Sequence, residues 1–411
     1  MSIPMPSAVF KFPGQVVNDV AYGASSNQLI FACRRDRRRK VLDPETGQSG
    51  TINRYVRRRI KDTPLFGCYN IIEIELAEVR LSNGVRRIEE VCFVEKGCYY
   101  TKRFCKLISG LCRHMTIQSV AKHFDLRWET VKNMDKLYLQ TTLPALNPGK
   151  LNNLKYIGVD EVARAKGHDY MTVVYDMVSG QLIWVEAGRT SDVFSIFLKQ
   201  LSPECASIIE AVAMDMGPAY QKSVRDNLPN ADIVFDRFHV MKNFSKAIDN
   251  QRRIEFRKAD NEGKKLMKGC RFLLLKNRDK LKERQEEKLK ILLNENKNLS
   301  AMYVLKEQLQ ALWSHSNYEE MHAALEQWCL IADASNMLYM KKFVKSARKN
   351  KVGICNYAKH SLTSARIEAG NVGIGLLRKR ARGIQDTEYF KLKIRQLGTA
   401  EEDSIFYKSG A

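Results

Sequence analysis

The spacing of apolar residues changes several times along the chain and divides it into stretches of different secondary structure. Residues 51–104 carry short apolar runs, of which residues 71–76 form the clearest, and this pattern predicts short strands. Ser82-Asn83-Gly84 has the composition of a turn between two of them. From residue 106 to residue 137 the apolar residues recur at helical spacing, which predicts a change from strands to helices.

Two helices separated by a tight turn are expected within this helical stretch. Thr116 suits the N-cap of the first helix, residues 125–127 suit the turn, and the second helix should run from Trp128 to Leu137. The apolar residues that would pack together are Val120, Ala121, Phe124, Val131, Met134 and Leu137. This pattern is typical of a DNA-binding helix-turn-helix, although an ordinary helical hairpin has the same pattern. The recognition helix would begin at Arg127, and its expected DNA-binding residues are Arg127, Thr130, Lys132 and Asn133.

Beyond a linker at residues 143–149, the pattern predicts three strands, a helix, a strand, a helix and a strand. The strands are expected at residues 155–160, 170–175, 181–186, 209–215 and 231–236. Ser179-Gly180 separates the second and third strands, which should form a hairpin. Ser191 can cap the first helix, and Gly217-Pro218 can open the second. The apolar residues that the first helix should bury are Val193, Ile196, Phe197 and Leu201. This order of elements is that of an α/β fold of the RNase H-like type.

From His239 to about Leu362 the chain is predicted to be helical almost throughout, as an α-helical insertion in the RNase H-like core. The predicted fold therefore consists of a small β-rich module, a helix-turn-helix and an interrupted α/β core. The expected boundaries are 1–105 for the basic N-terminal module, 106–148 for the helix-turn-helix and linker, 149–240 for the first part of the core, 241–360 for the insertion, and 361–411 for the last core helix and the tail.

The composition excludes several classes of protein. Hydrophobic residues make up 44% of the 411 residues, which is enough for a sizeable core and excludes a disordered chain. No apolar run reaches the roughly 18 residues of a spanning helix, so no membrane partner is expected. The first fifteen residues lack the pattern of a signal peptide. None of the ten cysteines form a CxxC pair. In a chain of this size without an export signal, the cysteines are expected to be reduced thiols, which predicts a cytoplasmic location.

The charge indicates the kind of partner. Lys and Arg number 68 against 46 for Asp and Glu, a net charge of +22, and such an excess predicts a polyanion, of which DNA is the first candidate. Basic residues cluster at residues 34–40, at residues 54–61 and near the C-terminus. Each cluster alone could be a solvated face, but three together favour contacts with backbone phosphates. The expected DNA-binding residues of the third cluster are Arg378, Lys379, Arg380 and Arg382.

Three carboxylates form the candidate catalytic centre. Asp160 and Asp215 each end an apolar strand, and their side chains would converge if those strands were neighbours. Two such carboxylates repel each other unless a cation lies between them, and Mg²⁺ prefers hard oxygen ligands. Glu368, at the start of a basic helical stretch, is the candidate for the third ligand. Alone, each aspartate could be a helix cap or turn residue, and the glutamate could be a solvated charge.

Asp236-Arg-Phe-His239 follows the fifth strand and is a candidate accessory element. Its aspartate could instead cap the next helix, and its histidine could be satisfied by a neighbour. Other motifs in order along the chain are Gly158-Val-Asp160-Glu161, Lys166-Gly-His168-x-Tyr170, Met214-Asp215-Met216 with Pro218 and Tyr220, Leu273-Leu-Leu-Lys276-Asn277, Glu368-x-Gly370-Asn371 and Arg380-x-x-Gly383.

In the order and spacing of these motifs, residues from about 55 to about 397 resemble the DDE transposases of the ISL-three family of bacterial insertion sequences. The resemblance implies a catalytic and metal-binding triad of Asp160, Asp215 and Glu368, with Mg²⁺ as cofactor and Mn²⁺ as a substitute. Asp236 and His239 resemble the aspartate-x-x-histidine element of transposases with helical insertions. The implied protein binds the terminal inverted repeats of its element and catalyses DNA cleavage and strand transfer.

The sequence departs from the family pattern in two places. Members usually begin with a zinc-ribbon-like module carrying two CxxC pairs, whereas here only Cys33 stands where the first pair would start, with Asp36 at its second position. Four zinc ligands cannot be assembled at ribbon spacing, so the module is predicted to be degenerate and without structural zinc. After the glutamate, Ala369 and Gly375 replace the usual glycine and lysine. The loss of a phosphate contact there would affect the level of activity rather than its class.

The function predicted from the sequence is that of a transposase acting on double-stranded DNA as a homodimer or larger assembly, in the bacterial cytoplasm and associated with the nucleoid. Trp313 or Trp328 could stack on an unpaired base at the element's end, although both suit a core as well. One alternative is a non-catalytic DNA-binding regulator derived from a transposase. Another is a structure-selective nuclease of the same fold, such as a junction resolvase. The sequence does not give the repeat or target sequence, the transposition pathway or the stoichiometry.

Overall fold

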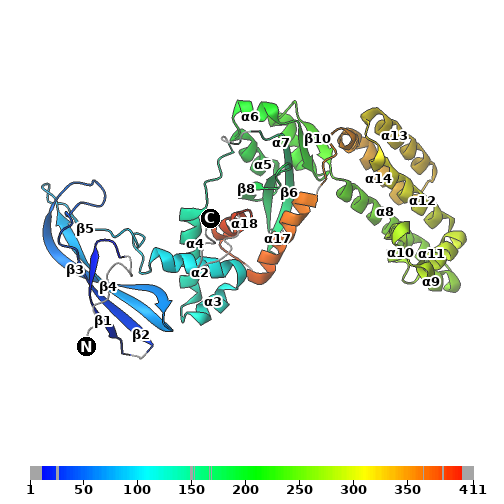
Figure 1. The fold of residues 1–411 in the computed structure, drawn as a ribbon. Coiled ribbons are helices and arrows are strands. Elements are labelled where there is room, and N and C mark those ends of the chain that lie inside the picture. The colour runs from blue at the N-terminus through cyan, green and yellow to red at the C-terminus, as the bar shows by residue number, and fades with distance from the viewer. Residues whose placement is uncertain are drawn as a thin grey trace. The chain divides into compact units, whose positions relative to one another are not determined.

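The computed structural model describes residues 12–24, 27–148, 151, 153–165, 167, 169–363, 365–381 and 384–399 (Figure 1). Contacts between residues group the chain into two compact units, residues 1–143 with 399–411 and residues 144–398. Each unit has its own sheet and its own apolar core. Within the described ranges, no helix combines the length and the apolar character that crossing a membrane requires.

The first unit begins with a five-stranded sheet. Its strands are β1 (Gln15–Tyr22), β2 (Gln28–Arg35), β3 (Thr51–Leu65), β4 (Cys68–Arg80) and β5 (Arg86–Ile88). The strand order is β1-β2-β4-β3, with β5 paired to β4. β3 and β4 form one long hairpin, so the strands here are longer than the short strands predicted. The predicted turn at Ser82-Asn83-Gly84 is present, with the Leu81 N–H donating to the Val85 carbonyl at 2.9 Å.

The long hairpin has an apolar face and a charged face because successive side chains of a strand point to opposite sides. The apolar face supplies the core of the sheet, whose buried members are Phe12, Phe31, Cys33, Ile60, Ile72, Ile74, Leu76 and Val94. On the opposite face, Arg57 is paired with Glu75 and Arg59 with Glu73 across β3 and β4. Arg57 and Arg59 therefore lie on the charged face of β3, because the opposite face of the same strand is packed into the core.

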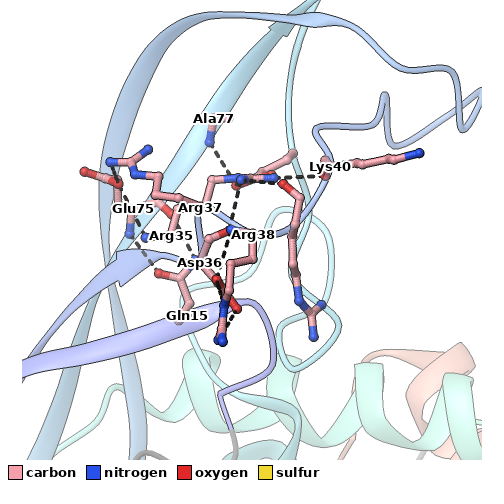
Figure 2. A network of polar contacts seen from close by, with 10 residues as sticks. Gln15, Arg35, Asp36, Arg37, Arg38, Lys40, Glu75 and Ala77 are labelled. Atoms are coloured by element: carbon pink, nitrogen blue, oxygen red, sulfur yellow. Dashed lines mark hydrogen bonds and ion pairs between the residues drawn. The ribbon is translucent and has the colours of Figure 1, made fainter.

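A buried arginine closes the end of this sheet. Arg35 is only 4% exposed, and its Nε donates to both carboxylate oxygens of Glu89 at 2.9 Å (Figure 2). The Ala77 N–H also donates to Glu89, at 3.0 Å. Beside them, the Gln15 side chain donates to the Glu75 carbonyl and accepts from the Glu75 N–H, at 2.9 and 3.2 Å. This polar network joins β1, β2, β4 and the segment after β5.

Replacing Glu89 by alanine should destabilise the first unit, because the Arg35 guanidinium would stay buried without its carboxylate. Removing one partner of a buried ion pair costs about 3 kcal/mol or more. We expect faster hydrogen–deuterium exchange in β2 and β4 of the full chain. Glu78→Ala is the matched control, because Glu78 pairs with the exposed Arg54 and surface pairs contribute little. Equal exchange in the two variants would contradict a structural role of the Arg35–Glu89 pair.

Three helices follow the sheet in the first unit: α2 (Lys102–His114), α3 (Ile117–His123) and α4 (Trp128–Thr142). Thr116 caps α3, with its hydroxyl accepting from the Ser119 N–H at 3.0 Å, as predicted. The turn before α4 contains Asp125 in the left-handed region, with φ of 49°. The buried residues that join the three helices include Phe104, Ile108, Val120, Ala121, Phe124, Val131 and Met134. The two predicted helices and their turn are therefore confirmed, and α4 continues to Thr142, beyond the expected end.

The sheet of the second unit has the order β10-β9-β6-β7-β8. Its strands are β6 (Tyr156–Ala165), β7 (Asp169–Asp176), β8 (Leu182–Ala187), β9 (Ala211–Met214) and β10 (Asp232–Phe235). β7 is antiparallel to β6 and β8, whereas β9 is parallel to β6 and β10 is parallel to β9. The predicted order of strands and the predicted β7–β8 hairpin are confirmed.

Helices cover both faces of this sheet. One face packs against α5 (Ser191–Lys199), α6 (Pro203–Ile208), α7 (Pro218–Asn227) and the first helix of the insertion. The other face packs against α17 (Ala365–Ala381) and α18 (Thr387–Leu397), drawn in orange and red beside the sheet in Figure 1. The second unit therefore has a layered α/β arrangement, with β6 and its neighbours in the middle.

Two details of α5 differ from the prediction. The N-cap is Thr190 rather than Ser191, because the Thr190 side chain accepts from the Val193 N–H. Ile196, expected in the core, is 48% exposed, and Phe194 is fully buried in its place. One helix face cannot bury all the apolar residues of this run, and the stacked rings of Phe194 and Phe197 occupy the buried face.

The insertion is helical, as predicted. Its helices are α8 (Arg237–Lys258), α9 (Asn261–Met267), α10 (Arg271–Leu275), α11 (Glu283–Glu295), α12 (Lys297–Ala311), α13 (Tyr318–Ala334), α14 (Leu338–Lys349), α15 (Lys351–Cys355) and α16 (Tyr357–His360). Trp328 is buried and donates its indole N–H to the Leu305 carbonyl at 2.9 Å. Trp313 is buried against Tyr357, with ring centroids 5.0 Å apart. Both indoles belong to the core, so stacking on a base would require either ring to leave this packing.

Candidate active site and DNA-binding elements

Three aspartates lie level with one another on neighbouring strands of the second sheet. Asp215 and Asp236 directly follow β9 and β10. Asp160 lies within β6, which continues to Ala165, so the prediction that this strand ends at Asp160 is wrong. Gly158 is paired with Ala213 in the parallel register of β6 and β9. Since parallel strands stay in step, Asp160 lies level with Asp215, and the β9–β10 register brings Asp236 level with Asp215 in the same way. The expected proximity of Asp160 and Asp215 thus follows from β6 and β9 being neighbours.

Asp160 is held by two hydrogen bonds. Its Oδ1 accepts from the Glu161 N–H at 2.7 Å, and its Oδ2 accepts from the Asn371 side chain at 2.6 Å. The Tyr175 hydroxyl donates to Asn371 in turn, at 3.3 Å. Asn371 lies one helical turn after Glu368 in α17. Asn371 is part of the motif Glu368-x-Gly370-Asn371, but no role was predicted for it from the sequence. The one available signal was that it lies three residues after the catalytic candidate Glu368.

His239 lies between two of the aspartates. Its Nδ1 is 3.2 Å from Oδ2 of Asp215, and its Nε2 is 3.8 Å from Oδ2 of Asp236. Asp236 itself caps α8, with its carboxylate accepting from the Phe238 N–H at 3.1 Å. The capping role and the approach to His239 are therefore both present, and the two interpretations of this element are compatible.

The carboxyl groups of Asp160 and Asp215 have opposite pKa shifts. Burial raises the pKa of Asp160, and the charge of Asp215 acts in the same direction, against the hydrogen bonds that Asp160 accepts. The hydrogen bond from His239 holds the pKa of Asp215 below its usual value, and the same bond raises the pKa of His239. The site concentrates negative charge, and the raised pKa of His239 favours the protonated ring, whose charge would balance part of it.

A small cavity brings the candidate residues together. Its polar lining is formed by Asp160, Asp215, Asp236, His239 and Glu368, and apolar side chains complete it. Glu368 reaches it from the first turn of α17. Among the described residues, no three His, Cys, Asp or Glu side chains are close enough to hold one metal ion. The donors nevertheless fit a hard divalent cation in their chemistry, since carboxylate oxygens from separate elements face one charged cavity.

Two glycines allow α17 to approach the sheet closely. A Cβ on Gly370 would lie 2.5 Å from the Tyr175 hydroxyl oxygen and 2.7 Å from Cε1 of the same ring. A Cβ on Gly158, in β6, would lie 2.6 Å from Cδ1 of Ile367. All three distances are below van der Waals contact, so neither glycine position has room for a larger residue. The close packing carries Asn371 to Asp160 and Glu368 to the cavity.

Of the predicted DNA-binding residues of the recognition helix, Thr130, Lys132 and Asn133 lie along α4, and Arg127 is its N-cap. Arg127 and Asn133 are exposed, whereas Thr130 and Lys132 are partly buried. In the C-terminal cluster, Lys379 is exposed and Arg380 partly buried. Arg378 donates to the Ala163 carbonyl at 2.8 Å, so its guanidinium is engaged within the protein. Four other predicted positions lie outside the described residues: the motif residues Lys166, His168 and Gly383, and the DNA-binding candidate Arg382.

Cys33, which stands where the first CxxC pair of a zinc ribbon would start, does not face solvent. Cys33 is buried in the apolar core of the first unit, and burial raises its pKa to about 12. A thiol with so high a pKa is protonated at neutral pH and is a poor metal ligand. The expectation of no structural zinc stays a prediction, which metal analysis of the purified protein tests: we expect far less than one zinc per chain.

Known proteins match both units. A family model described as "Transposase" matches residues 157–394, and one described as "Helix-turn-helix domain of transposase family ISL3" matches residues 89–139. The transposase for insertion sequence element IS1001 of Bordetella parapertussis is 32% identical over 342 residues, 82% of this chain and 84% of that protein. The transposase for insertion sequence element IS1557 of Mycobacterium tuberculosis is 29% identical over 312 residues, 70% of each chain. The matches include the helix-turn-helix and the sheet with the acidic cavity, and the chain therefore belongs to the ISL-three (ISL3) family of DDE transposases.

Proposed function

We propose that the protein binds the terminal inverted repeats of an insertion sequence and catalyses Mg²⁺-dependent DNA cleavage and strand transfer. The observation that carries this proposal is the acidic cavity, to which two adjacent strands and a helix distant in sequence contribute Asp160, Asp215 and Glu368. Carboxylates that converge from separate elements are what metal-assisted phosphoryl transfer on DNA requires.

We also infer that the second unit has an RNase H-like core with an α-helical insertion. The strand order β10-β9-β6-β7-β8, in which only β7 runs against the others, supports this assignment. The insertion lies between β10 and α17 in the sequence. The next element of the core is therefore α17, the helix that carries Glu368. We propose the same domains in the predicted order, with the degenerate zinc-ribbon-like module as the first. The predicted boundaries at 105/106 and 240/241 fall inside α2 and α8, so we place them before Lys102 and before Arg237.

Asp160, Asp215 and Glu368 would hold Mg²⁺, and Mn²⁺ would substitute. When bound, such ions activate an attacking oxygen and stabilise a leaving one. Asn371 fixes the carboxylate of Asp160, and His239 keeps that of Asp215 ionised. Water first cleaves the strand at the element's end, and the 3′-hydroxyl released then attacks a target phosphodiester in line. The reaction needs no covalent intermediate with the protein.

In the proposed complex, α4 lies in the major groove of the repeat. The exposed Arg127 and Asn133 suit base edges, and Lys132 suits a phosphate. Lys379 and Arg380 would contact DNA near the active site. Two ends must be joined for strand transfer, so a dimer or larger assembly is expected. A protein with this function would act on the bacterial nucleoid in the cytoplasm.

Replacing Asn133 by alanine should reduce discrimination at a single base pair by about 1–3 kcal/mol, because a bidentate contact with an adenine edge would be lost. Replacing Lys132 by alanine should instead weaken binding to every duplex and lower the salt slope by about 1. Fluorescence anisotropy with single-base variants of the repeat, at several salt concentrations, measures both effects. A uniform loss in both variants would contradict base reading by Asn133.

The test of the proposed function is cleavage of a labelled linear duplex carrying the element's own end, with Mg²⁺ or Mn²⁺. Nicking at the repeat boundary and joining to a target duplex are expected for the wild type and not for Asp215→Ala. Specific binding without cleavage by either protein would favour a transposase-derived regulator. Cleavage of branched DNA without any joined product would favour a structure-selective nuclease.

A further inference from the structure

We propose that residues 36–40 of the N-terminal module form a preformed phosphate-binding loop for the backbone of duplex DNA, shaped by Arg35, which does not touch the DNA itself. The proposal rests on the proposed function, since the duplex is the end of the element, and it adds a second contact surface to the helix-turn-helix.

The loop is folded around the Arg35 guanidinium. Nη1 donates to the carbonyls of Asp36 and Arg39 at 3.1 and 3.0 Å, and Nη2 donates to the Lys40 carbonyl at 3.0 Å (Figure 2). The Asp36 N–H donates to the Gly14 carbonyl at 2.9 Å, which ties the loop to the start of β1. Three carbonyls of a five-residue loop are thus held by one side chain, so the loop conformation is fixed before any ligand binds.

Arg35 is itself unavailable to a ligand. It is 4% exposed, its Nε faces the Glu89 carboxylate, and both of its Nη atoms donate to the loop carbonyls. Its charge is neutralised by Glu89 inside the module. Arg35 is therefore a positioning residue, although it belongs to the same basic run as its neighbours.

The other basic side chains of the run point outward. Arg37, Arg38, Arg39 and Lys40 are all exposed. Arg38 pairs with Asp36 at 3.0 Å, but Arg39 and Lys40 form no ion pair within the described part of the chain. Asp36 attracts Arg39 electrostatically, since the charge of Arg39 helps to lower the pKa of that carboxyl, but the two groups form no ion pair. Two exposed cations on adjacent residues are therefore available to neighbouring phosphates of a nucleic acid backbone.

The loop is continuous with the charged face of the sheet. The Arg37 guanidinium lies 3.8 Å from the centre of the Tyr55 ring in β3 and donates to Glu75 at 2.6 Å. Beyond Tyr55 the same face carries Arg57, Arg59 and Lys61, which alternate along β3 with residues of the opposite face. Across the hairpin, Glu75 stands opposite Arg57 and Glu73 opposite Arg59, and Glu73 forms an ion pair with Arg59 at 2.7 Å. This charge distribution along an extended strand fits a phosphate backbone rather than a compact anion.

The ligand that this charged surface fits best is duplex DNA, bound through its phosphates and without recognition of the bases. The long side chains of the loop and of β3 reach phosphates, whereas base edges in a groove are read by an inserted helix or ribbon. The surface should therefore add affinity and salt dependence equally to the element's end and to unrelated duplexes. An acidic protein or single-stranded RNA is a different occupant, which the experiment can detect.

The test uses the full chain and two labelled duplexes, one with the element's end and one scrambled. For the double variant Arg39→Ala, Lys40→Ala, the slope of log Kd against log salt should fall by about 2 for both duplexes, because two phosphate contacts are lost. The ratio of the two affinities should stay unchanged. Lys264→Ala, Lys265→Ala is the matched control, since it removes the same charge from α9 of the insertion.

Arg35→Lys tests the positioning role at constant net charge. A lysine cannot hold three carbonyls and a carboxylate together, so residues 36–40 should exchange hydrogen faster and the salt slope should fall. The lysine ammonium can still pair with Glu89, so we expect sequence-specific binding and protection in β2 and β4 to stay near wild type. Loss of both would instead show that Arg35 has a purely structural role. A slope that Arg35→Lys leaves unchanged would overturn the positioning role.

An unchanged slope in the Arg39, Lys40 double variant, with specific binding by the wild type intact, would overturn the loop proposal alone. The same holds if the double variant lost affinity for single-stranded RNA or acidic peptides but not for duplex DNA. If the wild type failed to bind either duplex, the proposed function would fail together with the loop.

Discussion

Asp160→Asn is expected to abolish cleavage of the element's end and strand transfer while leaving affinity for that end unchanged. The amide has nearly the size of the carboxylate and can still accept from the Glu161 N–H, so the fold of β6 should persist. The change removes one negative charge from a cavity lined by four carboxylates, where a divalent cation would bind. Residues that act as one catalytic unit typically cost roughly 10³-fold or more in rate when one is lost.

Asp236→Asn provides the contrast in the same assay. Asparagine caps a helix as well as aspartate does, so α8 should keep its first turn. Asp236 lies 3.8 Å from the His239 Nε2 and would act on the site through that ring, which predicts a loss of about 10–100-fold. Single-turnover cleavage with Mg²⁺ and Mn²⁺ measures both rates. Wild-type cleavage by Asp160→Asn would reject the proposed triad, and equal inactivity of the two variants would add Asp236 to the catalytic residues.

Local signals made much of the fold and part of the site predictable. Thr116 is followed by a helix-forming run and the turn at Asp125 by another, so caps and periodicity were sufficient to find α3 and α4. Asp160 and Asp215 end apolar runs, and the order of strands and helices allowed their strands to be placed side by side. The helices and the two aspartates could both be predicted because the residues that specify them are close together in the sequence.

Contacts between distant residues were not predictable. The hydrogen bond from Asn371 to Asp160 joins residues 211 positions apart, and nothing near Asn371 in the sequence specifies that partner. Arg35 belongs to a run of basic residues that looks uniformly solvated, yet its burial depends on Glu89, which lies 54 residues further along the chain. Which apolar residues of α5 and which tryptophans enter the core likewise depends on packing between elements rather than on spacing alone.

The second large effect is expected for Gly370→Ala, which should impair both stability and cleavage. The new Cβ would lie 2.5–2.7 Å from atoms of the Tyr175 ring, and Tyr175 is buried in β7, so the ring cannot move aside freely. The helix α17 must then shift away from the sheet, at a cost of about 1–3 kcal/mol. The shift would break the hydrogen bonds of Asn371 with Tyr175 and Asp160 and would draw Glu368 away from the cavity. Thermal unfolding and single-turnover cleavage should both show the loss, with DNA binding by the first unit retained.

Gly375→Ala is the matched control, because it makes the same substitution five residues further along α17. A Cβ at Gly375 meets no atom within 4 Å, so the site has room for it. Alanine is a better helix former than glycine by about 1 kcal/mol, and the variant should therefore be more stable than the wild type and at least as active in cleavage. The two glycines thus separate the effect of helix propensity from that of the distance between α17 and β7. If Gly370→Ala were stabilising as well, this would contradict our inference that the close packing of α17 against β7 positions Asn371 and Glu368.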